Sequence, residues 1–153
     1  MNSSNSQNSL KIIIVKSEFN NRITDSLLKG AENAFFSMGG LALNLKVYKV
    51  PGAFEIPGAI NQIIKNCKFD AIIAIGAVIR GETPHFDFIA SESASGIAKI
   101  SMESDFPVIN GIITTDNLKQ AEDRAESDGK NKGWEAMESA LKTIEAYQKI
   151  HSA

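Results

Sequence analysis

Four short runs of apolar and mostly β-branched residues recur along this chain of 153 residues. They lie at 11–15, 41–50, 71–79 and 108–113, and each is short enough to form one strand. The run at 71–79, AIIAIGAVI, is apolar throughout. Such a continuous run is typical of a strand that is covered on both faces, as in the middle of a parallel sheet.

The segments between these runs carry apolar residues every three or four positions, which predicts amphipathic helices. The first helix begins after Asn20 or Asn21, either of which is a good N-cap, and it ends at Gly39-Gly40. A short helix is predicted to follow Thr115 or Asp116. Further helical stripes are formed by Ala59, Ile60, Ile63, Ile64 and Cys67, by Phe86, Ala90, Ala94, Ile97 and Ala98, and by Trp134, Met137, Leu141 and Ile144.

The regular alternation of strand and helix indicates an α/β protein. Strands joined through helices run parallel, and right-handed crossovers place the helices on both faces of the sheet. We therefore expect three layers, α/β/α, around a four-stranded parallel sheet. The length fits one domain, assigned to residues 11–153, and the Asn- and Ser-rich segment 1–10 is expected to be flexible.

Composition removes several classes of function. The net charge of −2 argues against an extended nucleic-acid interface, and the longest apolar run has nine residues, too few to span a membrane. The polar start shows no signal peptide, so a cytoplasmic location is expected. Cys67 is the only cysteine and there are two histidines, so neither an intrachain disulfide nor a metal site is expected.

Candidate chemistry is concentrated where the predicted strands end. In open α/β sheets, ligands bind beyond the carboxyl ends of the strands. The segments 17–20, 51–55, 80–85 and 114–116 lie there, and each is richer in polar or aromatic residues than a connection requires. This edge of the sheet is therefore the expected site.

The segment 80–85 has the pattern of a helix start. Thr83 is predicted as the N-cap, Pro84 as the first helical residue and His85 as the second, while Gly81 permits close approach of a ligand. Free amides at a helix start suit a phosphate, although an ordinary capped helix has the same spacing. The positive helix end disfavours an imidazolium, so His85 is a candidate general base, or alternatively a histidine that only caps or packs.

Two further strand ends pair an aromatic residue with a polar one, Phe19 beside Asn20 and Phe54 beside Glu55. A ring can stack on a planar heterocycle while a carboxylate accepts hydrogen bonds from hydroxyl groups. Packing of both rings in the core, with a solvated Glu55, remains the alternative. Arg124 and the lysine at 132 flank a Gly-containing turn, which fits either a phosphate clamp or ordinary surface charges.

Taken together, these segments resemble the 6,7-dimethyl-8-ribityllumazine synthase family over residues 11–147. The resemblance is carried by Phe19-Asn20, VPGAFEIP at 50–57, GAVIRGETPHFD at 76–87, GIITT at 111–115, AEDRA at 121–125 and NKG at 131–133. It implies a flavodoxin-like fold and a transferase that acts in riboflavin biosynthesis. The reaction joins 5-amino-6-(D-ribitylamino)uracil to 3,4-dihydroxy-2-butanone 4-phosphate with loss of phosphate and water, without a metal or an organic cofactor.

The resemblance assigns one set of residues to the uracil substrate. Phe19 would stack on the pyrimidine, Ala53 and Phe54 would contact it, and Glu55 would bind the ribityl hydroxyls. A further contact is assigned to Asn110, where many members of the family have an aromatic residue. The backbone of Ala77, Val78 and Ile79 would line the ring site.

A second set is assigned to the phosphate-bearing substrate and to proton transfer. Glu82 and Thr83 would hold the phosphate at the helix start, and His85 would transfer protons. Arg124 would be the main phosphate cation, with Lys132 near it. Two departures from the family pattern occur nearby. Pro84 replaces a small residue, and Asp128 stands where a lysine is often found.

The resemblance also implies a homo-oligomer. In the family each site lies between neighbours in a pentamer, with the arginine and the lysine supplied by the adjacent chain. Some members close into icosahedral capsids that enclose riboflavin synthase as a partner, and the sequence leaves pentamer and capsid open.

The sequence is compatible with two other functions. A non-catalytic flavin- or ribityl-binding protein would need neither His85 nor Arg124, so the presence of both argues against it. A shell or scaffold protein is compatible with catalysis and differs only in its main role.

Overall fold

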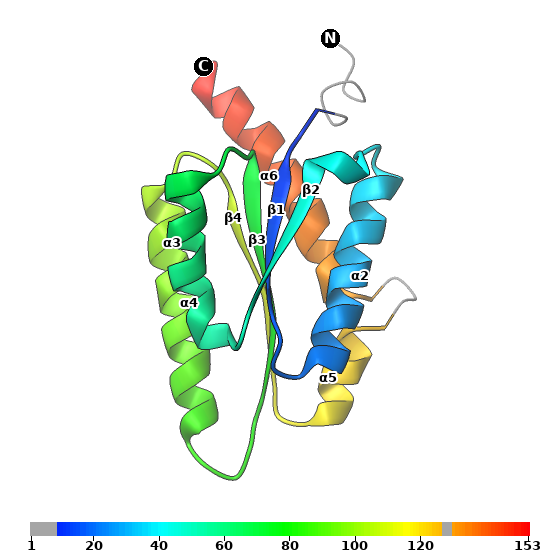
Figure 1. Cartoon of the computed structure of the whole chain (residues 1–153), viewed down its shortest axis with the longest axis vertical. Coiled ribbons are helices and arrows are strands. Elements are labelled where there is room, and N and C mark those ends of the chain that lie inside the picture. Colours follow the sequence, from blue (N-terminus) through cyan, green and yellow to red (C-terminus); the bar gives the residue numbers. More distant parts are fainter. Residues whose placement is uncertain (1–8, 127–129) are drawn as a thin grey trace.

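The computed structural model of the chain describes residues 9–126 and 130–153. At its centre is a four-stranded sheet in the order β2-β1-β3-β4, in which every neighbouring pair is parallel (Figure 1). The strands are β1 (Ile12–Ser17), β2 (Leu45–Val50), β3 (Ala71–Ile79) and β4 (Val108–Thr115). The expected parallel sheet is therefore confirmed.

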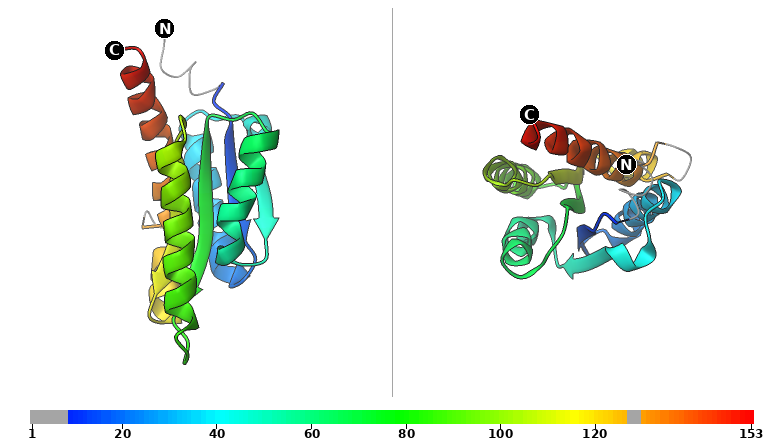
Figure 2. Two further views of the ribbon diagram at one scale, coloured as in Figure 1. Left: turned by 90° about the vertical axis from the view of Figure 1, so that its left-hand side faces the viewer. Right: turned by 90° about the horizontal axis from the view of Figure 1, so that it is seen from above.

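Helices cover both faces of this sheet (Figures 1 and 2). One layer consists of α2 (Asn21–Ser37), α5 (Leu118–Arg124) and α6 (Lys132–His151), and the other of α3 (Ile56–Asn66) and α4 (His85–Glu103). Two 3-10 turns, η1 (Ala42–Asn44) and η2 (Ala53–Glu55), flank β2. This is the three-layer, flavodoxin-like arrangement that we expected.

Each face of the sheet has its own apolar core. Ile12 and Ile14 of β1 point into the cluster under α2 and α6, whereas Ile13 and Val15 point into the cluster under α3 and α4. In β3 every residue from Ala71 to Val78 is buried. Burial on both faces explains why that strand is apolar without alternation.

The predicted strand at 41–50 was wrong in its first part. Residues 42–44 form η1, and the side chain of Leu43 is 84% exposed. The register pairs Leu45 with Ile12, the first residue of β1. Residues before Leu45 would therefore extend beyond the start of the neighbouring strand, where no ladder can form.

The first helix begins and ends where the sequence indicated. Asn20 is the N-cap of α2 with φ 60°, a left-handed conformation, and its Nδ2 donates to the carbonyl of Ala77 at 3.0 Å. At the other end Gly39 has φ 93°, and the N–H of Gly40 returns to the carbonyl of Phe35 at 2.8 Å. Glycine removes the steric penalty of that conformation.

Two helix starts differ from the prediction. The N-cap of α4 is Pro84 and not Thr83, because the N–H of Asp87 bonds to the Pro84 carbonyl at 3.1 Å, which makes His85 the first helical residue. The N-cap of α5 is Asn117, whose Oδ1 accepts from the N–H of Gln120 at 2.9 Å. Thr115 remains in β4. In both cases the residue that caps the helix is the one directly after the residue that the sequence indicated.

The stripe of mostly small residues on α4 is only partly buried. The buried positions are Ser93, Ile97 and Ile100, while Ala94 and Ala98 are exposed. Ala94 and Ala98 therefore lie on the surface of the chain.

Two expectations fall wholly or partly beyond the described residues. Residues 1–8 of the segment expected to be flexible lie outside them, whereas Leu10 is buried in the core under α2. Asp128, the departure noted near the phosphate, also lies outside them. Among the helices in the described parts of the chain, we find none with the length and apolar character needed to cross a membrane.

Candidate active site

An open pocket of about 690 Å³ lies at the carboxyl ends of the strands, on the side of α3 and α4. Its size is ordinary for a small-molecule site. Most of the residues assigned to the substrates from the sequence line it. They are Phe19, Ala53, Phe54, Glu55, Ala77, Val78, Ile79, Thr83 and His85.

The floor of the pocket is the end of β3. Ala77 and Val78 are buried, so they present mainly backbone to a ligand, and Ile79 is half-buried. The hydrogen bond from Asn20 to the Ala77 carbonyl ties the turn after β1 to this floor. Backbone groups at the end of a central strand are rigid, which suits recognition of the edge of a planar ring.

Aromatic side chains form one wall. Phe19 is 72% exposed and Phe54 is 49% exposed, so the alternative that these rings pack in the core is wrong. The ring of Phe54 is stacked on that of Phe88, with centroids 6.4 Å apart and an interplanar angle of 17°. Large apolar rings exposed around a pocket indicate that a flat apolar surface is covered when a ligand binds.

The start of α4 forms another part of the rim, next to Phe88. Gly81, Thr83 and His85 line the pocket there, and His85 is exposed. Glu82 is exposed within the same loop. The first amides of α4 and its positive end point toward this rim, an arrangement that suits an anionic group.

Arg80 fastens this rim to the sheet. Its Nε donates to Oδ1 of Asp116 at 3.0 Å, its Nη1 lies 3.4 Å from Oδ1 of Asp87, and its guanidinium lies 4.4 Å from the centre of the Phe86 ring. The hydrogen bond to Asp116 raises the pKa of Arg80 most, partial burial lowers it, and Asp87 adds a further rise. A raised pKa keeps the guanidinium charged at every working pH, so Arg80 introduces no pH dependence near neutrality.

Three residues assigned from the sequence lie elsewhere. Asn110 of β4 lines a separate hollow along α4, where its Oδ1 accepts from the N–H of Ile112 at 3.0 Å. Arg124 ends α5 and donates to the Gln120 carbonyl at 3.2 Å, and Lys132 begins α6 and pairs with Glu135 at 2.8 Å. Both cations belong to the helical layer on the opposite face of the sheet (Figure 1). Within the described residues, the pocket lining contains no arginine or lysine.

Sequence reasoning missed two parts of the site. Phe88 follows His85 by three positions, and residues at that spacing share a helix face, so the pattern could have placed its ring beside the pocket. The second part is the set of contacts made by Arg80, for which the sequence predicted no role. Its partner Asp116 is distant in sequence, so no local signal revealed the pair.

No potential metal centre was found in the described parts of the chain, where groups of at least three His, Cys, Asp or Glu side chains were sought. The pocket lining includes three side chains with groups that can hydrogen-bond or transfer protons, Glu55, Thr83 and His85.

The fold and the pocket define an α/β domain with a small-molecule site at the carboxyl edge of a parallel sheet. Residues 9–148 match the family described as 6,7-dimethyl-8-ribityllumazine synthase. A protein of that name from Campylobacter hominis is 48% identical over 140 residues, which cover 92% of this chain and 90% of the relative. Another from Nautilia profundicola is 46% identical over 140 residues, covering 92% of this chain and 91% of the relative.

The chain belongs to the 6,7-dimethyl-8-ribityllumazine synthase family. It is accordingly an enzyme of riboflavin biosynthesis, of the transferase class, as the motifs led us to expect.

Proposed function

We propose that this chain condenses 5-amino-6-(D-ribitylamino)uracil with 3,4-dihydroxy-2-butanone 4-phosphate to give 6,7-dimethyl-8-ribityllumazine. The observation that carries the proposal is the gathering, in one pocket, of exposed rings, a carboxylate, a backbone floor and a histidine at a helix start. These are the groups that a planar, hydroxylated substrate and a phosphate-bearing ketone require.

The uracil substrate is bound by the side of the pocket built from β1, η2 and β3. Phe19 and Phe54 supply flat apolar surfaces, and stacking of a base on an aromatic ring is worth ~1–3 kcal/mol. The backbone at Ala77 to Ile79 faces the edge of the ring, and Glu55 accepts hydrogen bonds from the ribityl hydroxyls. An extra contact from Asn110 would have to come from another chain, because this residue lies outside the pocket of its own chain.

The chemistry takes place near His85. The 5-amino group adds to the ketone carbonyl, and loss of water gives an imine. Removal of a carbon-bound proton then expels inorganic phosphate and leaves an enol. Protonation of the terminal carbon of this enol gives a methyl ketone, and attack by the ribityl-bearing nitrogen on its carbonyl carbon closes the ring with loss of a second water. His85 lies at the rim between the two substrates, where an imidazole can take a proton in one step and return it in another.

The phosphate would sit at the start of α4, beside Glu82 and Thr83. Because Arg124 and Lys132 lie on the other face of the sheet, we propose that a neighbouring chain supplies both cations. The exposed positions Ala94 and Ala98 of α4 leave room for close packing of such a neighbour. The expected assembly is a homopentamer, with riboflavin synthase as an enclosed partner if pentamers close into a capsid.

We place the enzyme in the cytoplasm, where a thiol such as that of Cys67 stays reduced. No nucleic acid is needed as a partner, since the two substrates are small molecules.

The test is to supply both substrates and follow the absorbance and fluorescence of the lumazine, with sedimentation of the same sample. Lumazine formation that depends on both substrates, by a species larger than one chain, is expected. Tight binding of a flavin or a ribityl compound without turnover would instead support the non-catalytic alternative.

A further inference from the structure

Lys16 is a buried charge that the proposed chemistry does not use. It is the fifth residue of β1, its side chain is 1% exposed, and it lies on the strand face that carries Ile12 and Ile14. Removing an ammonium group from water costs several kcal/mol unless partners compensate for it. An apolar side chain would satisfy the packing at this position, so the lysine indicates a role beyond packing.

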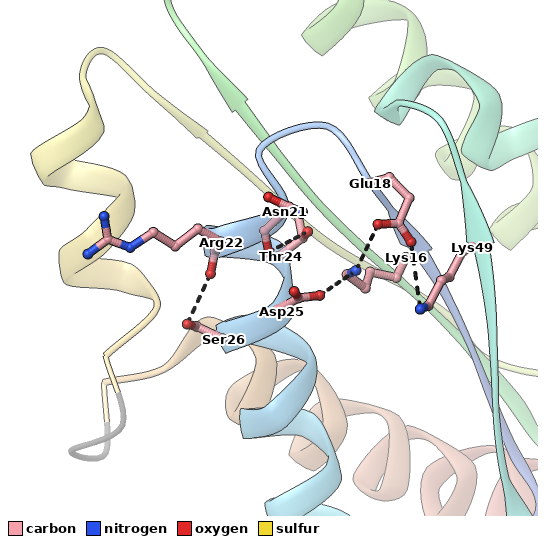
Figure 3. A network of polar contacts seen from close by, with 8 residues as sticks. All are labelled: Lys16, Glu18, Asn21, Arg22, Thr24, Asp25, Ser26 and Lys49. Atoms are coloured by element: carbon pink, nitrogen blue, oxygen red, sulfur yellow. Dashed lines mark hydrogen bonds and ion pairs between the residues drawn. The ribbon is translucent and has the colours of Figure 1, made fainter.

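Two carboxylates compensate the charge (Figure 3). The Nζ of Lys16 lies 2.5 Å from Oδ1 of Asp25 on α2 and 3.5 Å from Oε2 of Glu18. The second oxygen of Glu18, Oε1, lies 4.0 Å from Nζ of Lys49 on β2. We call these four residues the Lys16 network. Two ammonium groups and two carboxylates make its charge balanced.

The network is connected to the pocket through the chain, because Glu18 directly precedes Phe19, which lines the pocket. The backbone of this turn is also held, with the N–H of Glu18 bonded to the Val50 carbonyl at 2.8 Å and that of Phe19 to the Pro51 carbonyl at 2.9 Å. The ring of Phe19 is largely exposed, so its orientation depends on how firmly the turn is fixed.

Lys16 is the side chain that joins the turn to a helix. One of its ion pairs ends on α2 and the other on the residue before Phe19, so both ends of the turn between β1 and α2 share one buried cation. The left-handed backbone of Asn20, between them, costs about 1–2 kcal/mol for most residues. A turn that contains such a conformation needs fixed flanks.

We propose that Lys16 is a positioning residue for substrate binding, which presents Phe19 to the pyrimidine ring by holding Glu18 and Asp25 together. The inference rests on the proposed function, in which Phe19 stacks on that ring. The inference predicts that loss of Lys16 weakens the binding of one substrate and not of the other. The network belongs to β1, α2 and β2, whereas the phosphate-bearing substrate is expected at the start of α4, so only the affinity for the pyrimidine should depend on Lys16.

The first variant is Lys16→Met, which keeps the length of the side chain and removes its charge. The fold should tolerate it, because Asp25 and Glu18 are partly exposed and replacement of a buried ion pair by an apolar group is often neutral. Calorimetry with the ribitylaminouracil alone should show binding weakened roughly three- to tenfold, a part of the contribution of a full stacking contact. The KM for the butanone phosphate should change by less than about twofold, because the substitution removes no contact with that substrate.

Two further variants separate positioning from general damage. Glu18→Gln alters a partly exposed residue, so it folds even if Lys16→Met does not, and it should weaken the same binding. The double variant should bind the ribitylaminouracil no more weakly than the single variant with the lower affinity, because both substitutions break the same Lys16–Glu18 ion pair. Lys46→Met makes the same chemical change on β2, at an exposed lysine outside the network, and should leave the affinity unchanged.

The outcomes are distinguishable. Selective loss of pyrimidine affinity in Lys16→Met or Glu18→Gln supports the inference. Native affinity in Glu18→Gln and in any folded Lys16→Met, or equal losses for both substrates, would overturn it while the proposed function stands. If the unaltered chain binds no ribitylaminouracil, the proposed function itself is wrong.

Discussion

At the scale of single residues, Asn20 joins two parts of the pocket. Its backbone adopts φ 60°, and its side chain reaches the Ala77 carbonyl on the central strand. Asparagine tolerates this conformation better than most residues, and its amide supplies the donor. One residue therefore closes the turn that carries Phe19 and anchors it to the floor.

We expect Asn20→Ala to lower the free energy of unfolding by about 1–3 kcal/mol, from the left-handed backbone and the lost hydrogen bond together. Asn20→Gly keeps the conformation accessible and loses only the bond, so it should cost less than the alanine variant. Urea unfolding measures both changes. Equal losses in the two variants would show that the backbone conformation contributes nothing.

The second residue-scale prediction concerns His85. Turnover of His85→Ala at saturating substrates should fall by roughly ten- to a hundredfold, at or below the lower end of the range for positioned acid–base groups. The loss of turnover is limited because an amine and a ketone condense, although slowly, even without a catalyst. Stability should be unchanged, since the side chain is exposed. His151→Ala, near the end of α6, is the matched control, and unchanged turnover in His85→Ala would remove the assigned role.

The sequence predicted individual pocket residues through motifs at strand ends, but not their supports. Phe19, Phe54 and His85 stand next to clear local signals. Lys16 does not, because a lysine near the end of a strand normally reaches solvent. Its burial depends on Asp25, which comes from the next helix and becomes a partner only in the folded chain.

At the scale of elements, the layer of α2 and α6 depends on close backbone contact. A Cβ at Gly133 would collide with the carbonyl oxygen of Leu27 on α2. The cap of α6, Asn131, donates to the carbonyls of Ser26 and Ala125 at 3.1 and 3.0 Å. The start of α6, which carries Lys132, is therefore held tightly against α2.

Gly133→Ala should lower the free energy of unfolding by about 1–3 kcal/mol, the usual cost of overpacking, because backbone cannot move aside as a flexible side chain would. Gly58→Ala in α3 is the matched control. Apart from its chain neighbours and the backbone of its own helix, no described residue comes within 4 Å of the added Cβ. Alanine in place of glycine in a helix stabilises by up to ~1 kcal/mol. Urea unfolding midpoints of the two variants should therefore move in opposite directions.

Element types followed from the sequence because their periodicity is strong, whereas boundaries depended on contacts between elements. The continuous apolar run of β3 predicted a central strand, and the structure has it there. The start of β2 was predicted four residues early, since the limit is set by the register with β1. The helix α4 begins one residue later than predicted, because the Pro84 carbonyl accepts the first helical hydrogen bond.

At the scale of the whole molecule, the residues assigned to the phosphate-bearing substrate and to proton transfer lie on opposite faces of the sheet. His85 lies on the side of α3 and α4, whereas Arg124 and Lys132 lie in the layer of α2, α5 and α6 (Figure 2). Local patterns could not reveal this separation, because it depends on how the crossovers distribute helices between the two faces. The resemblance to the family supplied the expectation of a shared site, and the arrangement of the chain is consistent with it.

The most direct test of this account mixes two impaired variants, His85→Ala and Arg124→Ala, which are unfolded together and reassembled in equal amounts. A site that takes its histidine from one chain and its arginine from the next works only when the first is an Arg124 variant and the second a His85 variant. With random mixing in a cyclic ring, about a quarter of the sites should then form lumazine. Activity that rises well above either variant alone, and only after subunit exchange, is the predicted result. Mixed rings verified by mass spectrometry that show no gain in lumazine formation would contradict the shared site.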